Sequence, residues 1–183
     1  MSKALLIYAQ GSEDIEITAP ADILTRGGVE VLRVALGPQK VVKLAHGTSV
    51  VCDLCLNEVA PDENFDVILV PGGMPGSLHC SQSAELISML KKQKAAGRLI
   101  AAICAAPGFV LSRNGILENE RATGYPGCDE EIKNCSGQGV EVSENGQFIT
   151  AKGPAFAMLF GLKVLESLAG SETASKVAAG MLF

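Results

Sequence analysis

The candidate chemistry begins at Cys104, which stands between a strand-like apolar run and a helix-like segment. Residues 99–103 are small and apolar without interruption, which is typical of a strand buried on both faces. Ala105, Ala106 and Pro107 then open a segment with helical spacing, where a first-turn proline is tolerated. Free N–H groups at a helix amino terminus favour thiolate over thiol, and small residues allow a sharp turn. We therefore predict a nucleophilic Cys104, the alternative being a structural buried cysteine.

A partner carboxyl for this thiol comes from Glu16, one turn into the first predicted helix, or from Glu13. Two adjacent anions repel, so we expect the pair to share one proton, with the pKa of the carboxyl raised. A protonated Glu16 can donate a hydrogen bond to the thiolate and act as general acid and base. The alternative is a solvated first-turn charge that complements the helix dipole.

Two glycines, Gly72 and Gly73, follow another buried strand and offer backbone N–H groups that a ligand can approach closely. Ligands of open α/β sheets bind outside the carboxyl ends of the strands, where the Glu16, Gly72–Gly73 and Cys104 loops are all expected. Together with the N–H of Ala105, the glycine amides are predicted to form an oxyanion hole for a carbonyl adduct.

The other thiols and the histidines do not indicate a metal site or a second catalytic site. Cys52 and Cys55 have a CxxC spacing, but Cys80, Cys128 and Cys135 do not form the second tight pair that a zinc site needs, so we interpret the first two as structural and expect no metal. The only histidines, His46 and His79, lie outside the motifs, and a Cys–His nucleophile pair is not supported.

Strands that alternate with helices position these residues and predict an α/β fold with a mostly parallel, doubly wound sheet and helices on both faces. Strands are expected at 3–9, 29–36, 65–70, 99–103, 122–125, 140–143 and 148–151, with a hairpin from 41–45 and 49–52. Helices are expected at 12–26 with Ser12 as cap, 83–96, 154–168 and 171–182, with helical turns at 56–60 and 129–134.

Composition narrows the class of protein. The chain has 183 residues, 48% of them apolar and 19% charged, which fits one globular domain over 1–183 with a sizeable core. A net charge of −5 argues against nucleic acid as a main partner, and no run approaches the length of a membrane span. We see no signal peptide, so reduced thiols and a cytoplasmic location are expected.

Three motifs in order, AQGSEDIE, VLVPGG and AAICAAP, resemble the ThiJ/PfpI superfamily and, within it, its Parkinsonism-associated deglycase (DJ) branch. The similarity runs over nearly the whole chain and includes TGYPG and the late KGPAFAMLFGL segment. It implies a flavodoxin-like three-layer sandwich and a homodimer. No cofactor is expected, because a thiolate and a carboxyl suffice for the chemistry. The resemblance also implies that Cys104 is the oxidisable nucleophile with Glu16 as its partner, and that Cys52 matches a second family cysteine near the dimer interface.

The chain departs from the family pattern at three places. Ala105 stands where protease-like members have histidine, which speaks against peptidase chemistry, and Tyr125 replaces a histidine of the animal members. Met74 replaces a common asparagine. Tyr125, Met74 and Pro154 are the residues we expect to line the site.

The resemblance implies a glutathione-independent glyoxalase and deglycase that acts on methylglyoxal, glyoxal and early glycation adducts, with a role in oxidative stress. A redox sensor or chaperone, in which Cys104 is only a peroxide target, is the main alternative. A biosynthetic enzyme is a further alternative, because some relatives carry thiamine-related names, but nothing in the sequence marks a phosphate site.

Overall fold

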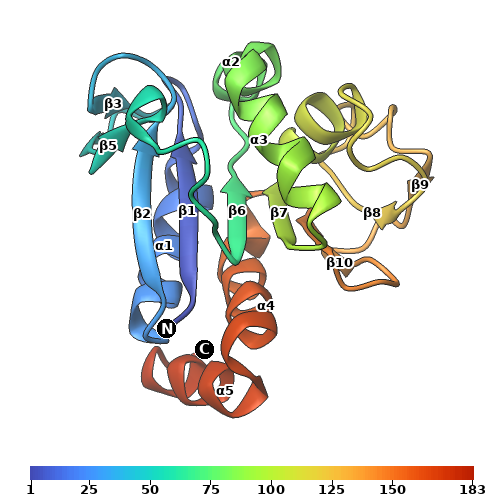
Figure 1. Ribbon diagram of the computed structural model, residues 1–183. Helices are drawn as coiled ribbons and strands as arrows, with labels where there is room; N and C mark the ends of the chain where they lie inside the picture. Colours follow the sequence, from blue (N-terminus) through green and yellow to red (C-terminus); the bar gives the residue numbers. More distant parts are fainter.

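The computed structural model describes residues 1–183 and is organised around one seven-stranded sheet (Figure 1). Its strands follow the order β5–β2–β1–β6–β7–β11–β10, and every neighbouring pair is parallel except β10–β11. The run β2–β1–β6–β7–β11 has the flavodoxin-like order 2-1-3-4-5, which confirms the predicted fold class. The strands are β1 (Lys3–Tyr8), β2 (Glu30–Ala35), β5 (Leu54–Cys55), β6 (Val67–Val70), β7 (Leu99–Ile103), β10 (Val140–Val142) and β11 (Phe148–Ala151).

The central strands are apolar throughout because both faces of the sheet are covered. All five residues of β7 are buried, as are the last five of β1. Successive side chains alternate between the faces, so Leu6 and Tyr8 belong to one core cluster while Leu5 and Ile7 belong to the other. A strand that packs on both sides carries a continuous hydrophobic run, as the sequence indicates for 99–103.

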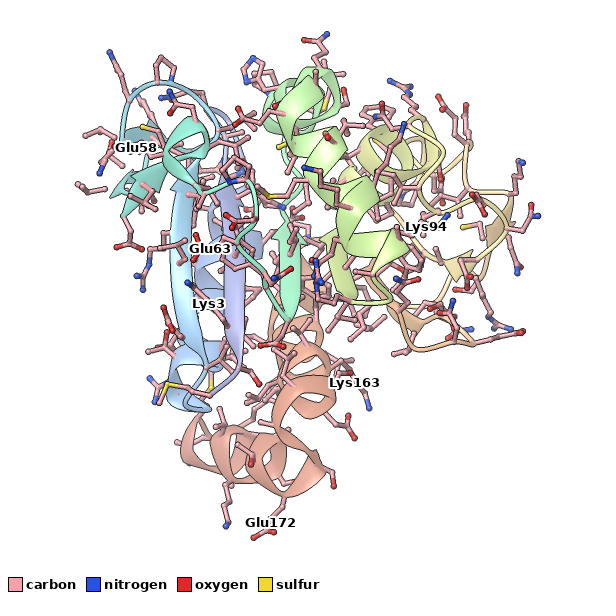
Figure 2. The ribbon with its side chains drawn as sticks, viewed as in Figure 1. Lys3, Glu58, Glu63, Lys94, Lys163 and Glu172 are labelled. Carbon is pink, nitrogen blue, oxygen red and sulfur yellow. The ribbon has the colours of Figure 1, made fainter.

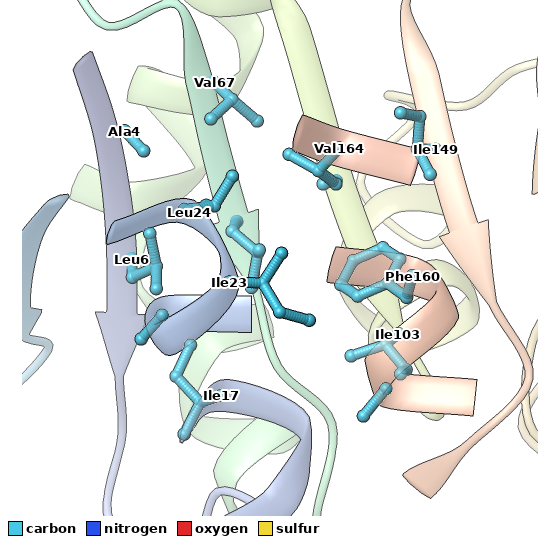
Figure 3. Close-up of a cluster of buried hydrophobic side chains, with 14 of the residues drawn as sticks. Ala4, Leu6, Ile17, Ile23, Leu24, Val67, Ile103, Ile149, Phe160 and Val164 are labelled. Atoms are coloured by element: carbon cyan, nitrogen blue, oxygen red, sulfur yellow. The ribbon is translucent and has the colours of Figure 1, made fainter. Parts of the chain in front are cut away.

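Helices cover the two faces and complete three layers. α1 (Asp14–Arg26) and α4 (Ala157–Ala169) pack on one face, where Phe160 and Val164 meet Ile23 and Ile149 (Figure 3). α5 (Ser171–Gly180) packs against α4 at the end of the molecule (Figure 1). α2 (Gly76–Gln82), α3 (Ala84–Ala95) and the π-helical turn η2 (Pro107–Ser112) cover the other face (Figure 1). The expected helices on both faces are therefore confirmed.

Smaller elements lie around this frame. A hairpin of β3 (Val41–Lys43) and β4 (Ser49–Val51) is formed as predicted. The helical turn predicted at 56–60 is present as a shorter 3₁₀ turn, η1 (Leu56–Glu58). Another 3₁₀ turn, η3 (Pro154–Phe156), precedes α4. β8 (Arg121–Ala122) pairs with β9 (Asn134–Cys135), so the strand predicted at 122–125 is shorter and shifted.

Two expectations about local structure are wrong, and one short helix is not predicted. The helical turn expected at 129–134 is absent, because residues 129–133 form irregular turns and Asn134 begins β9. The short helix α2 is not among the predicted elements, because its seven residues begin with glycine and show no apolar repeat. Ser12 does not cap α1. Its hydroxyl instead accepts a hydrogen bond from the N–H of Ala9, while Glu13 is the residue that caps the helix. A carboxylate performs this role as well as a hydroxyl because both accept an N–H.

Several charged side chains form ion pairs at the surface, among them Lys163, Glu172 and Lys94, which Figure 2 labels. Lys163 pairs with Glu166 along α4, and Glu172 pairs with Lys176 along α5. Lys94 reaches Glu118 across a loop at 2.9 Å. No helix has both the length and the apolar character that crossing a bilayer requires.

Candidate active site

Three loops at the carboxyl ends of parallel strands build the site. β7 leads into Cys104, β6 leads into Gly72 and Gly73, and β1 leads through a short loop into α1 and Glu16. These strands are neighbours in the order β1–β6–β7, so their carboxyl ends lie side by side at the end of the sheet where α2 begins (Figure 1). The structure thus brings together residues that are far apart in the sequence.

The backbone at Cys104 is sharply bent. Its φ is +65°, which non-glycine residues adopt rarely. The turn is held from both sides, because the Cys104 N–H donates to the Ala151 carbonyl at 2.8 Å and its own carbonyl accepts from the Tyr125 N–H at 2.7 Å. This is the kind of sharp turn that the sequence indicates between strand and helix, and it places Cys104 at the carboxyl end of β7.

Glu16 lies directly against this cysteine and is completely buried. Its Oε2 accepts the Gly72 N–H at 2.9 Å, whereas Oε1 is buried without a hydrogen-bond partner. A methyl group at Gly72 would lie 2.5 Å from Glu16 Oε2 and 3.0 Å from Cys104 Sγ, so both functional groups converge on this glycine. The exposed first-turn charge that was the alternative for Glu16 is excluded by this burial.

The two acids influence each other. Burial raises the pKa of the Glu16 carboxyl to about 7, against the opposing effects of the adjacent Cys104 thiol and the Gly72 N–H. Burial, followed by the neighbouring Glu16 carboxylate, raises the pKa of the Cys104 thiol to about 12. The Gly73 and Ala105 amides act in the opposite direction and stabilise the thiolate. The raised carboxyl pKa agrees with the expectation, so one negative charge is shared by the pair over a wide pH range.

The direction of the Cys104 shift is opposite to the sequence expectation of a low thiol pKa. The two amides do interact with the sulfur as a helix amino terminus should, but burial and the adjacent carboxylate outweigh them. The thiol is 9% exposed. Ionisation of Cys104 therefore depends on where the proton of the pair resides.

The expected amide donors are divided between the two acids. Gly73 and Ala105 interact with the sulfur, while their predicted role toward a carbonyl oxygen stays a prediction. The N–H of Gly72 instead donates to the carboxylate of Glu16, so this residue orients the carboxyl and is not free to bind an oxyanion. Gly73 has a φ of +84°, and a Cβ there would lie 2.3 Å from the Glu13 nitrogen, so only glycine fits this close approach.

The residues predicted to line the site have different surroundings. Tyr125 is half-exposed, and its ring lies over Gly153, where an added Cβ would contact it at 3.3 Å. Pro154 follows that glycine and is partly buried, while Met74 is half-exposed after the glycine pair. Tyr125 therefore adjoins both Cys104, through its N–H, and the Gly153–Pro154 segment, whereas Met74 belongs to the loop after β6.

The remaining thiols and both histidines lie elsewhere. All six cysteines are free, and Cys52 and Cys55 are buried in the core, with burial raising the pKa of Cys52 to about 11. His46 Nε2 lies 3.8 Å from Glu13 Oε1, and His79 Nδ1 lies 3.0 Å from the Gln10 carbonyl oxygen. Neither of these two contacts involves Cys104.

A cavity of about 440 Å³ lies outside this site, between residues 59–65 and α3. None of the residues of the cysteine–carboxyl pair lines it. The reactive groups instead lie at the carboxyl ends of central strands, where Cys104 is 9% exposed and Glu16 is completely buried.

One residue of the site was underestimated from the sequence. Glu13 appeared only as a second candidate carboxyl, but its Oε2 accepts the Glu16 N–H at 2.8 Å and fixes the first turn of α1. The three-residue spacing between Glu13 and Glu16 is that of a helix cap, which is the signal that identifies it.

Comparison with known proteins agrees with this geometry. The model of the DJ-1/PfpI family matches residues 2–167. The chain belongs to the DJ-1/PfpI family. It is 38% identical over 185 residues to the protein dj-1beta of Drosophila melanogaster, a match that covers all of this chain and 98% of that protein. It is 35% identical over 179 residues to the glutathione-independent glyoxalase DJR-1.2 of Caenorhabditis elegans, covering 93% and 90% of the two chains.

The fold comparison extends this to solved structures. Oxidised DJ-1 of Toxoplasma gondii superposes with a TM-score of 0.96 at 38% identity, covering all of this chain and 99% of the other. The DJ-1 branch suggested by the motifs is thereby confirmed, together with the α/β architecture.

Proposed function

We propose that this DJ-1/PfpI protein is a cysteine-dependent, cofactor-free glyoxalase that converts methylglyoxal and glyoxal to hydroxy acids without glutathione. The observation that carries the proposal is the contact of Cys104 with the buried Glu16 carboxyl, whose pKa burial raises to about 7. A relative at 35% identity is named as a glutathione-independent glyoxalase, which supports this reaction. Early glycation adducts are proposed as further substrates on the same chemistry.

The reactive form carries the charge of the pair on sulfur and the proton on Glu16. Sulfur has two amide donors, Gly73 and Ala105, whereas the carboxylate has one, Gly72. Glu16 Oε1, which has no partner in the structure, is then the oxygen that bears the proton and donates it toward sulfur. Movement of one proton within the pair generates the nucleophile without a histidine.

The thiolate adds to the aldehyde carbon and forms a hemithioacetal, while Glu16 or solvent protonates the new oxyanion. The amides of Gly73 and Ala105 stabilise the charge on that oxygen as it develops. Glu16 as carboxylate then removes the proton from the former aldehyde carbon and returns it to the adjacent carbon, which converts the hemithioacetal to a thioester. Water hydrolyses the thioester, releasing lactate from methylglyoxal or glycolate from glyoxal and restoring the thiol.

The enclosed site supports a small substrate. Cys104 is 9% exposed and Glu16 is fully buried, so a two- or three-carbon aldehyde fits better than a folded protein surface. Water exclusion also strengthens the interaction of the amides with the developing charge. Tyr125, Pro154 and Met74 are proposed to line the approach to the sulfur.

The test is lactate formation from methylglyoxal without added glutathione, for the wild type and Cys104→Ser. Serine is close in size, so the fold should be retained, and turnover should fall to background because an alcohol at neutral pH is a far weaker nucleophile. Cys135→Ser, which changes an exposed cysteine away from the pair, is the matched control and should keep full activity. Lactate formation by Cys104→Ser at the wild-type rate would refute the nucleophile assignment.

A redox sensor is the second candidate function, and it is supported by the Toxoplasma gondii relative, whose structure is of an oxidised protein. In that function Cys104 reacts with peroxide and Glu16 only hydrogen-bonds the oxygens of the oxidised sulfur. A wild-type protein that forms no lactate but is oxidised at Cys104 would favour this alternative.

We further propose, from the family resemblance, that two copies of the chain form a homodimer. Val41 and Val51 are paired across the β3–β4 hairpin and are both exposed, and Ile15 is exposed on the first turn of α1. Asp14 joins these elements by accepting hydrogen bonds from the N–H groups of His46 and Thr48. The exposed apolar side chains therefore belong to adjoining segments, which supports burial against a second copy.

A further inference from the structure

Glu13 lies between the cysteine–carboxyl pair and the β3–β4 hairpin, and it is bonded on two sides. Its N–H donates to the Gly72 carbonyl at 3.2 Å, and its Oε2 accepts the N–H of Glu16 at 2.8 Å. The N–H of Gly72 in turn donates to Glu16 Oε2 at 2.9 Å. Three hydrogen bonds therefore form a closed circuit through Glu13, Gly72 and Glu16.

This circuit connects the two loops that carry the catalytic groups. The Glu13 cap sets the backbone of the first turn of α1, from which the Glu16 side chain extends toward Cys104. The bond from Glu13 N–H holds the Gly72–Gly73 loop against α1, and Gly73 packs onto the Glu13 backbone, where a Cβ would lie 2.3 Å from the nitrogen. A change at Glu13 therefore acts on the carboxyl and on the amide donors together.

The charge on Glu13 is also directed at the pair. The residue is buried, and its carboxylate is among the groups that raise the pKa of Glu16, after burial itself. Among the other ionisable groups nearby, His46 faces Glu13, whereas Asp14 and His79 face elsewhere. Asp14 accepts the backbone N–H groups of the hairpin turn, His46 is an exposed ring 3.8 Å from Glu13 Oε1, and His79 contacts the Gln10 carbonyl.

We propose that Glu13 is a positioning residue for the reaction, which holds Glu16 and the Gly72–Gly73 loop in register and uses its charge to keep the shared proton on the cysteine–carboxyl pair. It does not touch the substrate. Its effect on turnover rests on the proposed glyoxalase function, whereas its effect on the ionisation of Cys104 does not. The two effects are therefore measured separately.

The first experiment measures the rate at which iodoacetamide alkylates Cys104 as a function of pH, with mass mapping to separate Cys104 from the exposed Cys135. Glu13→Gln keeps an oxygen that can accept the Glu16 N–H but removes the charge. The midpoint of the alkylation profile should shift to lower pH, because the like charge that opposes ionisation of the pair is gone. Asp14→Asn is the matched control, since it removes a charge one residue away that faces the hairpin, and its midpoint should stay in place.

The second experiment measures methylglyoxal turnover of the same variants and of Glu13→Ala. Loss of the cap should reduce kcat by about tenfold or more with little change in KM, because positioning of a reacting group is steep. Glu13→Gln, which retains the cap, should recover kcat to within about threefold at the plateau of its own pH profile. This rescue distinguishes positioning from a general loss of stability, and circular dichroism checks that each variant is folded.

A Glu13→Gln profile that overlays the wild type would overturn the inference, as would an equal shift in Asp14→Asn. Wild-type kcat in a folded Glu13→Ala would also overturn it. If the wild type forms no lactate, the glyoxalase proposal fails, but a shifted alkylation midpoint in Glu13→Gln would still support the role of Glu13 toward Cys104.

Discussion

At the residue scale, the site depends on one proton shared by two buried acids. Glu16 is completely buried, with one carboxyl oxygen bonded to Gly72 and the other unpartnered. Cys104 lies beside this carboxyl, and its backbone has a positive φ. An isolated buried carboxylate is costly, and an isolated buried thiolate is costly too, so the pair lowers the cost by keeping a single charge between them.

Turnover of Glu16 variants tests the proton transfer. Glu16→Gln keeps the size and the acceptor for the Gly72 N–H but cannot accept a proton from carbon. We expect kcat for lactate formation to fall by about 10²–10⁴-fold, the usual cost of losing a general base. Glu16→Asp should also lose activity, because the shorter side chain withdraws the carboxyl from the sulfur.

The control for this prediction is the reactivity of the thiol itself. Cys104 of Glu16→Gln should still react with an alkylating reagent, so that loss of turnover is assigned to proton transfer and not to a collapsed site. Near wild-type turnover in Glu16→Gln would contradict the shuttle mechanism and favour the redox-sensing alternative.

The raised pKa of Glu16 also predicts how stability depends on pH. The unfolded carboxyl loses its proton near the ordinary value of 4.5, whereas in the folded protein the pKa is about 7. Between these values the unfolded state binds fewer protons, so the contribution of Glu16 to the free energy of unfolding falls as pH rises from 4.5 to 7. The loss is of the order of 3 kcal/mol.

Denaturant unfolding of the wild type and Glu16→Gln at several pH values checks this linkage. Glu16→Gln should gain stability relative to the wild type as pH rises through this window, since the uncharged amide does not titrate. Comparing the two pH slopes removes the contributions of the other carboxylates, which both proteins share. One of these is Asp14, whose pKa is lowered by its hydrogen bonds with the hairpin, although burial acts in the opposite direction. Parallel pH curves for the two proteins would show that the Glu16 pKa is not raised.

At the scale of elements, the site is the meeting point of three strand ends and depends on a glycine at their junction. The β6 loop passes so close to Cys104 and Glu16 that an added Cβ at Gly72 would lie 2.5 Å from each of Cys104 Cβ and Glu16 Oε2. No side chain fits there unless the pair moves apart.

Gly72→Ala is therefore expected to reduce turnover by about 10²-fold and to lower the free energy of unfolding by roughly 1–3 kcal/mol, the range for overpacking. The control is Gly37→Ala, because Gly37 has open space where a Cβ would lie and its φ is not positive. Lactate assays and denaturant titrations of both variants measure the two effects. Equal behaviour of the two variants would mean that the contact at Gly72 is not limiting.

At the scale of the whole molecule, the exposed apolar residues of the hairpin and α1 predict self-association. We expect light scattering to give twice the 19.0 kDa mass of one chain. Val51→Asp should shift the mass toward the monomer, because Val51 is 72% exposed in one chain and an aspartate there harms the interface and not the fold.

Val142→Asp serves as the control, since Val142 is also exposed but lies on the edge strand β10. It should leave the mass unchanged. A wild-type protein with the mass of a single chain would contradict the homodimer, and equal effects of the two aspartates would place the interface elsewhere.

Much of the fold and of the site follows from the sequence because the signals are local. The uninterrupted apolar run before Cys104 predicts a strand buried on both faces, and alternation with amphipathic segments predicts the doubly wound sheet. The bend at Cys104 is indicated by the strand-to-helix transition through small residues. The motifs around Glu16, Gly72 and Cys104 also indicate the family, which the match over residues 2–167 confirms.

Tertiary structure decided what these residues do to one another. The sequence places Cys104 at a helix amino terminus, but its pKa depends on burial and on Glu16, which only folding supplies. Likewise, the N–H of Gly72 is an available donor in the sequence and is taken by Glu16 in the fold. The cap at Glu13 in place of Ser12 is, by contrast, a local effect, since the Ser12 hydroxyl accepts the N–H of Ala9 three residues earlier. Hydrogen bonds and electrostatic effects depend on distances between residues far apart in the chain, and those distances exist only after the strands have paired.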